Sequence, residues 1–506
     1  MACQGRRHIF RPAVRLTLQI SVWEAFIFCS VFCAIGLSGA IGAFAQSIDF
    51  RYPLNWRQDA ELTDLHCIDA NRCWIVGDRG LVMHTEDGGK HWRSIKLVGD
   101  RRDSESPRIQ CRLESVFFVS ATHGWIAGGY SNAGSTTSTG VLFATVDGGK
   151  SWKQLQGIAL PKINQVFFKT PLNGIAIGDG NAAKPTGIFS TRDGGRTWSF
   201  VKSGSVESWH TAGHFQGLSV LASASGKLGR YESESLTPSL IEQQTVDRPA
   251  HRQINQFQML DERYGFAVGD MNHLLITRNG GHSWGSIDVN LGEPVDFYTL
   301  SIQGNRIWLA GNPGSTIWTR TMEEEQWIPQ ETPLRTPISK LTFVNERVGW
   351  AIGICGDIVH TSDGGQSWQL QRRGTGGVAL LQIADQTADF VPELFSKYCG
   401  DENYIGAALH LDFRSPTERP AKFAELEPSM DHLRQALTRV GGCFALNRRL
   451  FHRPPGSKII NDPATILARD IRSLRPRVIA LPAGQVKNSN NLRGLVLDAV
   501  KIAAES

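Results

Sequence analysis

The chain has 506 residues, of which 41% are hydrophobic and 20% are charged, with a formal net charge of +5 at pH 7. This length accommodates two domains with sizeable cores. Lys and Arg are spread along the chain without a run of five, so the mild positive charge gives no argument for nucleic-acid binding, and we expect none.

Residues 1–45 have the pattern of an export signal or membrane anchor. Four arginines up to Arg15 precede an apolar run at 25–44, which ends in Ala43-Phe44-Ala45. A basic flank, an apolar stretch and a small-x-small site are typical of a secretory signal peptide. An uncleaved anchor is the alternative, because about 20 apolar residues can span a bilayer. Both interpretations place the remaining chain in a periplasmic or extracellular space.

Residues 48–372 contain a repeated motif. Asp-Gly-Gly followed two residues later by Trp occurs four times, and once more with Asn for Asp, each time with a Thr two residues upstream. The first residue and the Trp of each copy are Asp87 and Trp92, Asp147 and Trp152, Asp193 and Trp198, Asn279 and Trp284, and Asp363 and Trp368. Asp-Gly favours a tight turn with positive φ, and the Asp and Thr side chains can bind backbone N–H groups there. The Trp can fill the space between neighbouring repeats, so we predict that these ten residues are structural.

The same region shows a fixed order of short apolar strands. In the clearest copy, strands at 113–118, 124–128 and 141–145 precede the turn, and another strand follows the Trp. Four strands per roughly 40–45 residues, repeated, are typical of a β-propeller blade. The gaps Trp198–Trp284 and Trp284–Trp368 are about two units long, so we place degenerate units at 209–241 and before Trp327. The count predicts an all-β seven-bladed β-propeller, with six or eight blades as alternatives.

Two features near the start of this region bear on its closure. Trp56 resembles the repeated Trp, and the segment 54–58 could complete the last blade from the N-terminal side. Cys67 and Cys73 flank one predicted hairpin and can face each other, which predicts a disulfide in an exported protein. Two separately buried thiols are the alternative. No Cys or His spacing is that of a zinc site, and we expect no cofactor.

The motif Thr-x-Asp-Gly-Gly-x-x-Trp resembles the Asp-box, or BNR repeat, of sialidases and related propellers. The longer pattern, with Gly-Trp/Phe-x-x-Gly before it at 124–128, 265–269 and 349–353, is similar to the photosystem II stability/assembly factor propellers and their bacterial relatives. This resemblance covers Leu62 to Trp368. It implies an exported, non-enzymatic propeller that binds a protein partner, which could be membrane-associated, and acts in assembly or stability.

A sialidase-like glycosidase is the alternative that the Asp-box leaves open. Such a site needs an Arg triad, a Tyr nucleophile and acidic partners. Tyr130, Tyr231, Tyr264 and Tyr298 are available, but nothing in the sequence orders them into a site.

Residues 378–506 alternate between strand and helix patterns, which predicts a small α/β domain. We expect strands at 378–384, 405–411 and 477–481, and helices at 392–398, 430–440, 462–474 and 492–504. The region resembles the PIG-L family of zinc-dependent deacetylases, best at 466–479 and 491–500. The family's ligand motif is replaced here by Ala384–Asp389 without its His, and Asn490-Asn491 stands where the family has Asp-His. The resemblance implies a degenerate domain in which Asp385 and Asp389 alone cannot hold zinc; retained deacetylase activity is a further alternative.

Overall fold

The computed structural model describes residues 56–505 with gaps, the longest at 98–110, 233–239, 244–252, 413–432, 450–462 and 482–488. Residues 1–45, predicted as a signal peptide or anchor, lie outside the described residues. In the part of the chain that is described, no helix is both long and apolar enough to cross a membrane.

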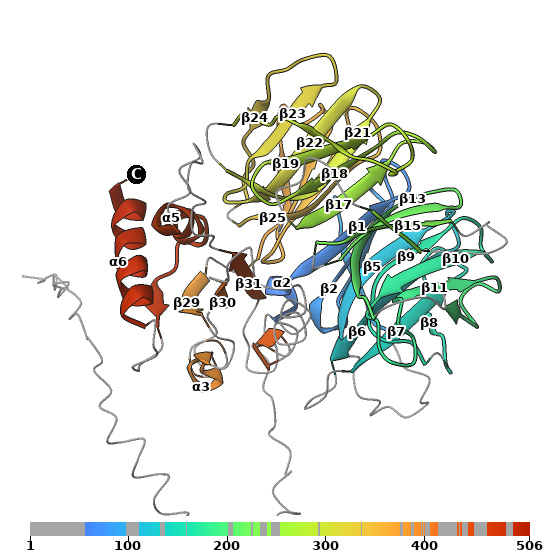
Figure 1. Ribbon diagram of the computed structural model, residues 1–506, viewed down its shortest axis with the longest axis horizontal. Helices are drawn as coiled ribbons and strands as arrows, with labels where there is room; N and C mark the ends of the chain where they lie inside the picture. Colours follow the sequence, from blue (N-terminus) through green and yellow to red (C-terminus); the bar gives the residue numbers. More distant parts are fainter. Residues whose placement is uncertain are drawn as a thin grey trace, which may run out of the picture. The chain divides into compact units, whose positions relative to one another are not determined.

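Seven four-stranded antiparallel sheets form a ring, which is the predicted seven-bladed β-propeller (Figure 1). Blades 1 to 3 are β1–β4 (Leu62–Cys67, Cys73–Gly77, Val82–Thr85, Arg93–Ile95), β5–β8 (Arg112–Phe118, Gly124–Ser131, Ser138–Thr145, Lys153–Gln154) and β9–β12 (Ile163–Phe168, Gly174–Gly178, Ile188–Thr191, Ser199–Phe200). Blades 4 and 5 are β13–β16 (Trp209–Phe215, Leu218–Ser223, Leu228–Glu232, Leu240–Gln243) and β17–β20 (Ile254–Met259, Gly265–Gly269, His273–Thr277, Gly285–Ile287). Blades 6 and 7 are β21–β24 (Asp296–Gln303, Arg306–Asn312, Ile317–Thr321, Ile328–Gln330) and β25–β28 (Ile338–Phe343, Gly349–Gly353, Ile358–Thr361, Gln369–Arg372).

The first strand of each blade is the inner strand of the ring. Each inner strand contacts the inner strand of the next blade, and β25 contacts β1, so the ring is closed. The apolar residues of the first two strands pack between blades. One such cluster joins Trp74 and Val76 of blade 1 to Val116, Phe118 and Phe143 of blade 2. The two degenerate units, blades 4 and 6, keep all four strands although they lack the repeated turn, because their apolar strand pattern is intact.

Among the described residues, the last blade contains no strand from the N-terminal side. Trp56 lies in helix α2 (Trp56–Asp59), and the four strands of blade 7 are consecutive in the chain. For its described residues, 56–58, the expectation that segment 54–58 completes this blade is therefore wrong. Helix α2 instead lies against the loops of blade 7, where the Gln58 side chain donates to the carbonyl of Arg373 at 3.1 Å.

The C-terminal region is a four-stranded parallel sheet in the order β31-β30-β29-β32 (Phe444–Arg449, Ile405–Asp412, Val378–Ala384, Val478–Ala480). Helices α5 (Pro463–Leu474) and α6 (Ser489–Glu505) cover one face, and the short helix α3 (Pro392–Phe395) contributes to the other. The predicted α/β class is correct, but strand β31 was missed. The expected helix at 430–440 falls largely outside the described residues.

Candidate functional site

The five Thr-x-Asp/Asn-Gly-Gly-x-x-Trp motifs, here called box turns, are closed hydrogen-bond circuits. In blade 2, the Thr145 hydroxyl accepts the N–H of Gly149 at 2.9 Å and donates to the Asp147 carboxylate at 2.8 Å. The same carboxylate accepts the backbone N–H of Ser151 at 3.0 Å and its hydroxyl at 2.5 Å. Both glycines have positive φ, at 74° for Gly148 and 81° for Gly149, a conformation that a Cβ would strain. The box turn thus uses its polar atoms to hold its own shape.

These bonds to the carboxylate set its acidity. The hydroxyl of Ser151 lowers the pKa of Asp147 to about 2, and the hydroxyl of Thr197 does the same for Asp193. At Asn279 an amide takes the same place: its oxygen accepts from Thr277 at 3.0 Å and from the N–H of Ser283 at 2.9 Å. An amide that makes the same bonds indicates a structural task rather than acid–base chemistry.

Box turns also link one blade to the next. The indole N–H of Trp125 in blade 2 donates to the carbonyl of Gly194 in the box turn of blade 3 at 3.0 Å. Blade 4 lacks a Trp at the matching place, and the Arg230 guanidinium donates to Gly280 of blade 5 instead, also at 3.0 Å. The box Trp lies in the same seam: Trp152 packs in the cluster between blades 1 and 2, with its ring edge-on to Phe118.

Polar side chains of the inner strands bind the backbone of the next blade in two successive layers. In one layer, Asp64, Ser115, Gln165, Gln256 and Thr299 accept the N–H of Val116, Val166, Ala212, Leu300 and Leu341, respectively. In the other, Thr63, Asn164, His210, Asn255 and Ser339 donate to the carbonyls of Leu113, Trp209, Ile254, Phe297 and Leu62. A backbone irregularity near the start of the inner strand turns two successive side chains toward the neighbouring blade, as at Leu62/Asp64, where Thr63 and Asp64 both bind blade 2. These side chains hold the ring together, and sequence reasoning did not find them.

One side of the ring carries the β2–β3 loop of blade 1 and its counterparts, with a balanced ion-pair network. Arg112 binds Glu61 at 2.5 Å and Glu114 at 3.1 Å, and Lys162 binds Glu114 at 3.1 Å. The Arg112 side chain is 19% exposed and that of Lys162 is 8% exposed. Although burial opposes it, Glu114 and Glu61 raise the pKa of Arg112. Both cations are neutralised here, so the network does not offer a free Arg cluster to an anionic ligand.

The opposite side of the ring, here called the box side, carries the first hairpin turn of each blade and the box turns. These turns bind each other, for example through the Gly148 N–H, which donates to the Thr122 carbonyl at 2.9 Å.

Four half-buried rings lie in a row at the box-side end of the inner strands of blades 1 to 4. We call them the aromatic row: His66, Phe117, Phe167 and His214. Successive ring centroids are 5.1, 4.9 and 4.7 Å apart. Burial lowers the pKa of His66, and it lowers that of His214 to about 3, so both rings are neutral at pH 7. The row is a continuous uncharged aromatic surface that the box motifs did not reveal.

The four tyrosines considered for a glycosidase are not brought together. Tyr130 is 42% exposed in strand β6 of blade 2, Tyr264 is 41% exposed in a turn of blade 5, and Tyr231 is buried in blade 4. Burial raises the pKa of both Tyr231 and Tyr298, whereas a Tyr nucleophile needs activation in the other direction. The geometry therefore gives no support to a sialidase-like site.

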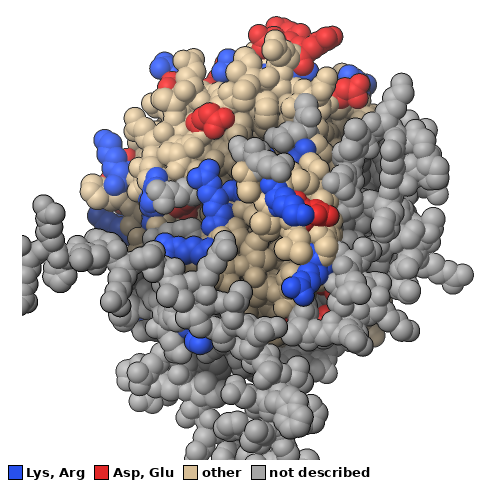
Figure 2. Space-filling model, turned by 90° about the vertical axis from the view of Figure 1, so that its left-hand side faces the viewer, with Lys and Arg blue, Asp and Glu red and all other residues tan. Residues whose placement is uncertain are grey.

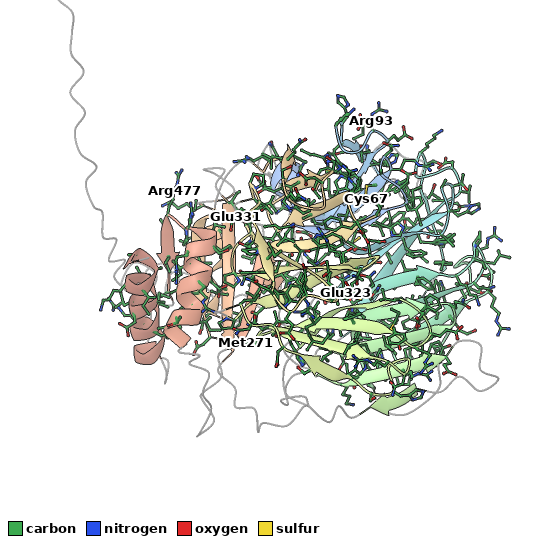
Figure 3. The ribbon with its side chains drawn as sticks, turned by 90° about the horizontal axis from the view of Figure 1, so that it is seen from above. Cys67, Arg93, Met271, Glu323, Glu331 and Arg477 are labelled. Atoms are coloured by element: carbon green, nitrogen blue, oxygen red, sulfur yellow. A yellow bond between two sulfur atoms is a disulfide. The ribbon has the colours of Figure 1, made fainter. Side chains whose placement is uncertain are left out.

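The two cysteines and the two C-terminal aspartates singled out in the sequence lie in different parts of the structure. Cys67 and Cys73 form a disulfide that clips the β1–β2 hairpin (Cys67 is labelled in Figure 3). In the C-terminal domain, Asp385 directly follows β29 and the carbonyl of Asp389 accepts from Gln382. Among the described residues, no three His, Cys, Asp or Glu side chains are grouped as a metal site would require. The likeness to zinc deacetylases stays a prediction.

Basic side chains mark the outer face of the C-terminal helices. Figure 2 shows the molecule from the side of α5 and α6, where Lys and Arg side chains gather near the centre. Three basic residues are exposed on these two helices: Arg472, Arg493 and Lys501. Arg477, which is labelled in Figure 3, is exposed in the segment that follows α5. Arg472 lies in the last turn of α5, where a positive charge interacts favourably with the helix dipole.

Comparisons with known proteins support the propeller resemblance. The family model described as photosynthesis system II assembly factor YCF48 matches residues 52–219 and 238–327. The photosystem II assembly lipoprotein Ycf48 of Synechococcus sp. (strain CC9902) is 29% identical over 175 residues, which are 32% of this chain and 44% of that relative. The chain thus matches less than half the length of this curated relative.

Two solved structures are similar in part. A structure of YCF48 from Cyanidioschyzon merolae has a TM-score of 0.47 and 17% identity, over 60% of this chain and 96% of that chain. A structure of YCF48 bound to D1 peptide has a TM-score of 0.47 and 19% identity, over 60% of this chain and 94% of that chain.

Proposed function

This chain belongs to the photosynthesis system II assembly factor YCF48 family, and we propose from that premise that it is an exported, non-enzymatic propeller that binds a protein partner and assists its assembly or stability. The observation that carries the proposal is the family match, which runs from blade 1 to Trp327 of blade 6. The proposed partner is a polypeptide whose apolar side chains are covered by the propeller on binding.

The aromatic row is the surface that we assign to this binding. The polar atoms of the box turns bind within the turn, and the polar side chains of the inner strands bind the backbone of the next blade. The charges around Arg112 neutralise one another in ion pairs. Phe117 and Phe167 are half-buried rings whose remaining surface is free of such bonds. Aromatic rings at protein interfaces contribute large apolar contacts, and a few of them carry most of the binding energy.

Export fits the sequence and the related protein. The N-terminal segment has the pattern of a signal peptide or anchor, and the curated relative is named a lipoprotein. We therefore propose that the propeller works on the outer side of the membrane, close to a membrane-embedded or newly exported partner.

The test is capture of a partner from solubilised membranes by the full chain, followed by chemical cross-linking. We expect the Phe117→Ala/Phe167→Ala double variant to lose at least about tenfold in partner recovery. Tyr264→Ala, which removes an exposed ring from a turn of blade 5, is the matched control and should bind as the parent does. Circular dichroism checks that both variants are folded. Failure of the parent to retain a partner at any salt concentration would refute the function, and equal recovery by both variants would refute the site.

A further inference from the structure

The ring has one seam that the chain does not cross. Every blade consists of four consecutive strands, so six junctions between blades are spanned by a chain connection, and the junction of blades 7 and 1 is not. At this seam the Ser339 hydroxyl donates to the Leu62 carbonyl at 3.0 Å, and the Lys340 ammonium lies 3.2 Å from the Asp64 carboxylate. The Ser339 bond is of the same kind as those at the other junctions, and the indole N–H of Trp92 also donates to the Gln371 amide oxygen across this seam at 3.1 Å. Without a linker to keep the blades close, the seam is where the ring can open most easily.

The C-terminal domain packs on the loops next to that seam. Ile354 and Cys355, in the β26–β27 loop of blade 7, are 3% and 1% exposed and belong to one apolar cluster with Val378, Leu381 and Leu467 of the C-terminal domain. Blade 7 thereby shares a core with this domain, and separating them would expose apolar surface to water.

Helix α5 of the same domain binds blade 6 through polar contacts. The amide of Asn312 donates to the Asp470 carboxylate at 2.7 Å, and both residues are 1% exposed. The N–H of Gly314 donates to the Ser473 hydroxyl at 3.1 Å, and the Arg469 guanidinium donates to the Pro294 carbonyl at 3.0 Å. A buried carboxylate that loses its donor is strongly destabilised, so these contacts fix the position of α5.

The start of blade 1 is reached through helix α2 and the segment that leaves blade 7. The Gln58 side chain of α2 donates to the Arg373 carbonyl of that segment at 3.1 Å. Asp59 of helix α2, which leads into β1, packs against Gly374, where a Cβ would meet its carboxylate at 2.8 Å. Gly374 lies in the segment that leaves blade 7 for the C-terminal domain. Blades 6 and 7 are therefore in contact with this domain, and helix α2, which leads into blade 1, contacts the segment leading to it.

From these contacts we propose that the C-terminal domain, together with the segment that leads to it from blade 7, is the clasp of the propeller. It keeps blade 7 and helix α2 at the start of blade 1 together, in place of a strand exchange, of which the described residues show none. This role requires no catalytic or metal site in the domain and is independent of the proposed partner. It accounts for a buried polar interface between residues 158 positions apart, Asn312 and Asp470.

The test is hydrogen exchange by mass spectrometry on the full chain. Asn312→Asp places a second carboxylate against Asp470, and Arg469→Ala/Ser473→Ala removes the flanking bonds without adding charge. In both variants we expect amides of α5 and of blades 1 and 7 to exchange about tenfold faster or more, while blades 3 and 4 exchange as in the parent. Arg472→Ala is the control, because its side chain is exposed and donates to the Ala468 carbonyl of its own helix.

The readout separates a clasp from a merely attached domain. Faster exchange in α5 with unchanged blades 1 and 7 would show a domain that docks without closing the ring. Equal acceleration of all seven blades would show general destabilisation. Unchanged exchange in α5 in both variants would show that these contacts do not hold the domain. Each of these three results overturns the proposal.

Discussion

Replacing Asp147 separates the shape of a box turn from its charge. The carboxylate accepts three hydrogen bonds, from Thr145 and from the N–H and hydroxyl of Ser151. Asp147→Ala removes all three, and at roughly 0.5–1.5 kcal/mol each, reduced for solvent exposure, the loss in local stability is about 2 kcal/mol. Asp147→Asn should cost about 0.5 kcal/mol, because the natural box turn at Asn279 makes the same bonds with an amide, whose N–H₂ donates to Ser283 at 2.9 Å.

Native-state hydrogen exchange of β7 and β8 measures the effect. A loss of about 2 kcal/mol accelerates exchange about thirtyfold in the Ala variant, and the Asn variant should stay within about threefold of the parent. Because the folded pKa of Asp147 is about 2, its contribution is complete above about pH 4 and is lost as pH falls through 2. The Asn variant does not titrate and should lack that component of acid sensitivity. Equal exchange in the two variants would refute the bonding scheme.

Three further substitutions test other parts of the ring. His214 has a folded pKa of about 3 against about 6.5 unfolded, so the fold is destabilised as pH falls below 6.5, where the unfolded chain takes up a proton that the folded ring does not. Between pH 8 and pH 5 this costs the parent about 2 kcal/mol, and we expect that loss, measured by urea midpoints, to be absent in His214→Asn. An unchanged pH profile in the variant would contradict this. Arg112→Met leaves Glu61 and Glu114 without their shared cation and should cost about 3 kcal/mol in the same assay, whereas Arg112→Lys keeps a positive charge and should cost less; equal losses in the two variants would argue against charge as the cause. Trp125→Phe keeps the ring stack but removes the bond to the box turn of blade 3, and thermal denaturation should show a loss of about 1–2 kcal/mol; no loss in this variant, beside a clear loss in Trp125→Ala, would mean that packing alone matters.

The blades were predictable because their signals are local. Asp-Gly-Gly needs positive φ at its glycines, and the strands on either side alternate with fixed spacing, so five copies define the unit. Blade 4 could be placed by counting alone, although its link to blade 5 uses Arg230 where blades 2 and 6 use Trp125 and Trp308. The use of Arg in place of Trp left no repeat signal in the sequence of blade 4, because the hydrogen bond to the next box turn requires only an N–H donor at that place.

The rest depends on contacts between distant residues. Gln165 binds Ala212 of the next blade, and a polar residue in a strand gives no sign of which backbone it will satisfy. The aromatic row arises because His66, Phe117 and His214 occupy similar places in different blades, which becomes visible only with the register in hand. Trp56 looked like a repeated Trp, but it precedes the first blade and belongs to a helix.

Because every blade is one uninterrupted stretch of chain, the ring is modular at the level of the gene. A duplication or deletion of one unit of about 43 residues adds or removes a whole blade, without splitting a sheet between two ends of the chain. In a propeller closed by strand exchange, the same event next to the ends would break the shared sheet. Here the inner strands offer the same pattern of donors and acceptors to each neighbour, so an inserted blade would find matching partners on both sides. The number of blades in such a ring is therefore easier to change than its closure, which depends on residues that lie outside the repeats.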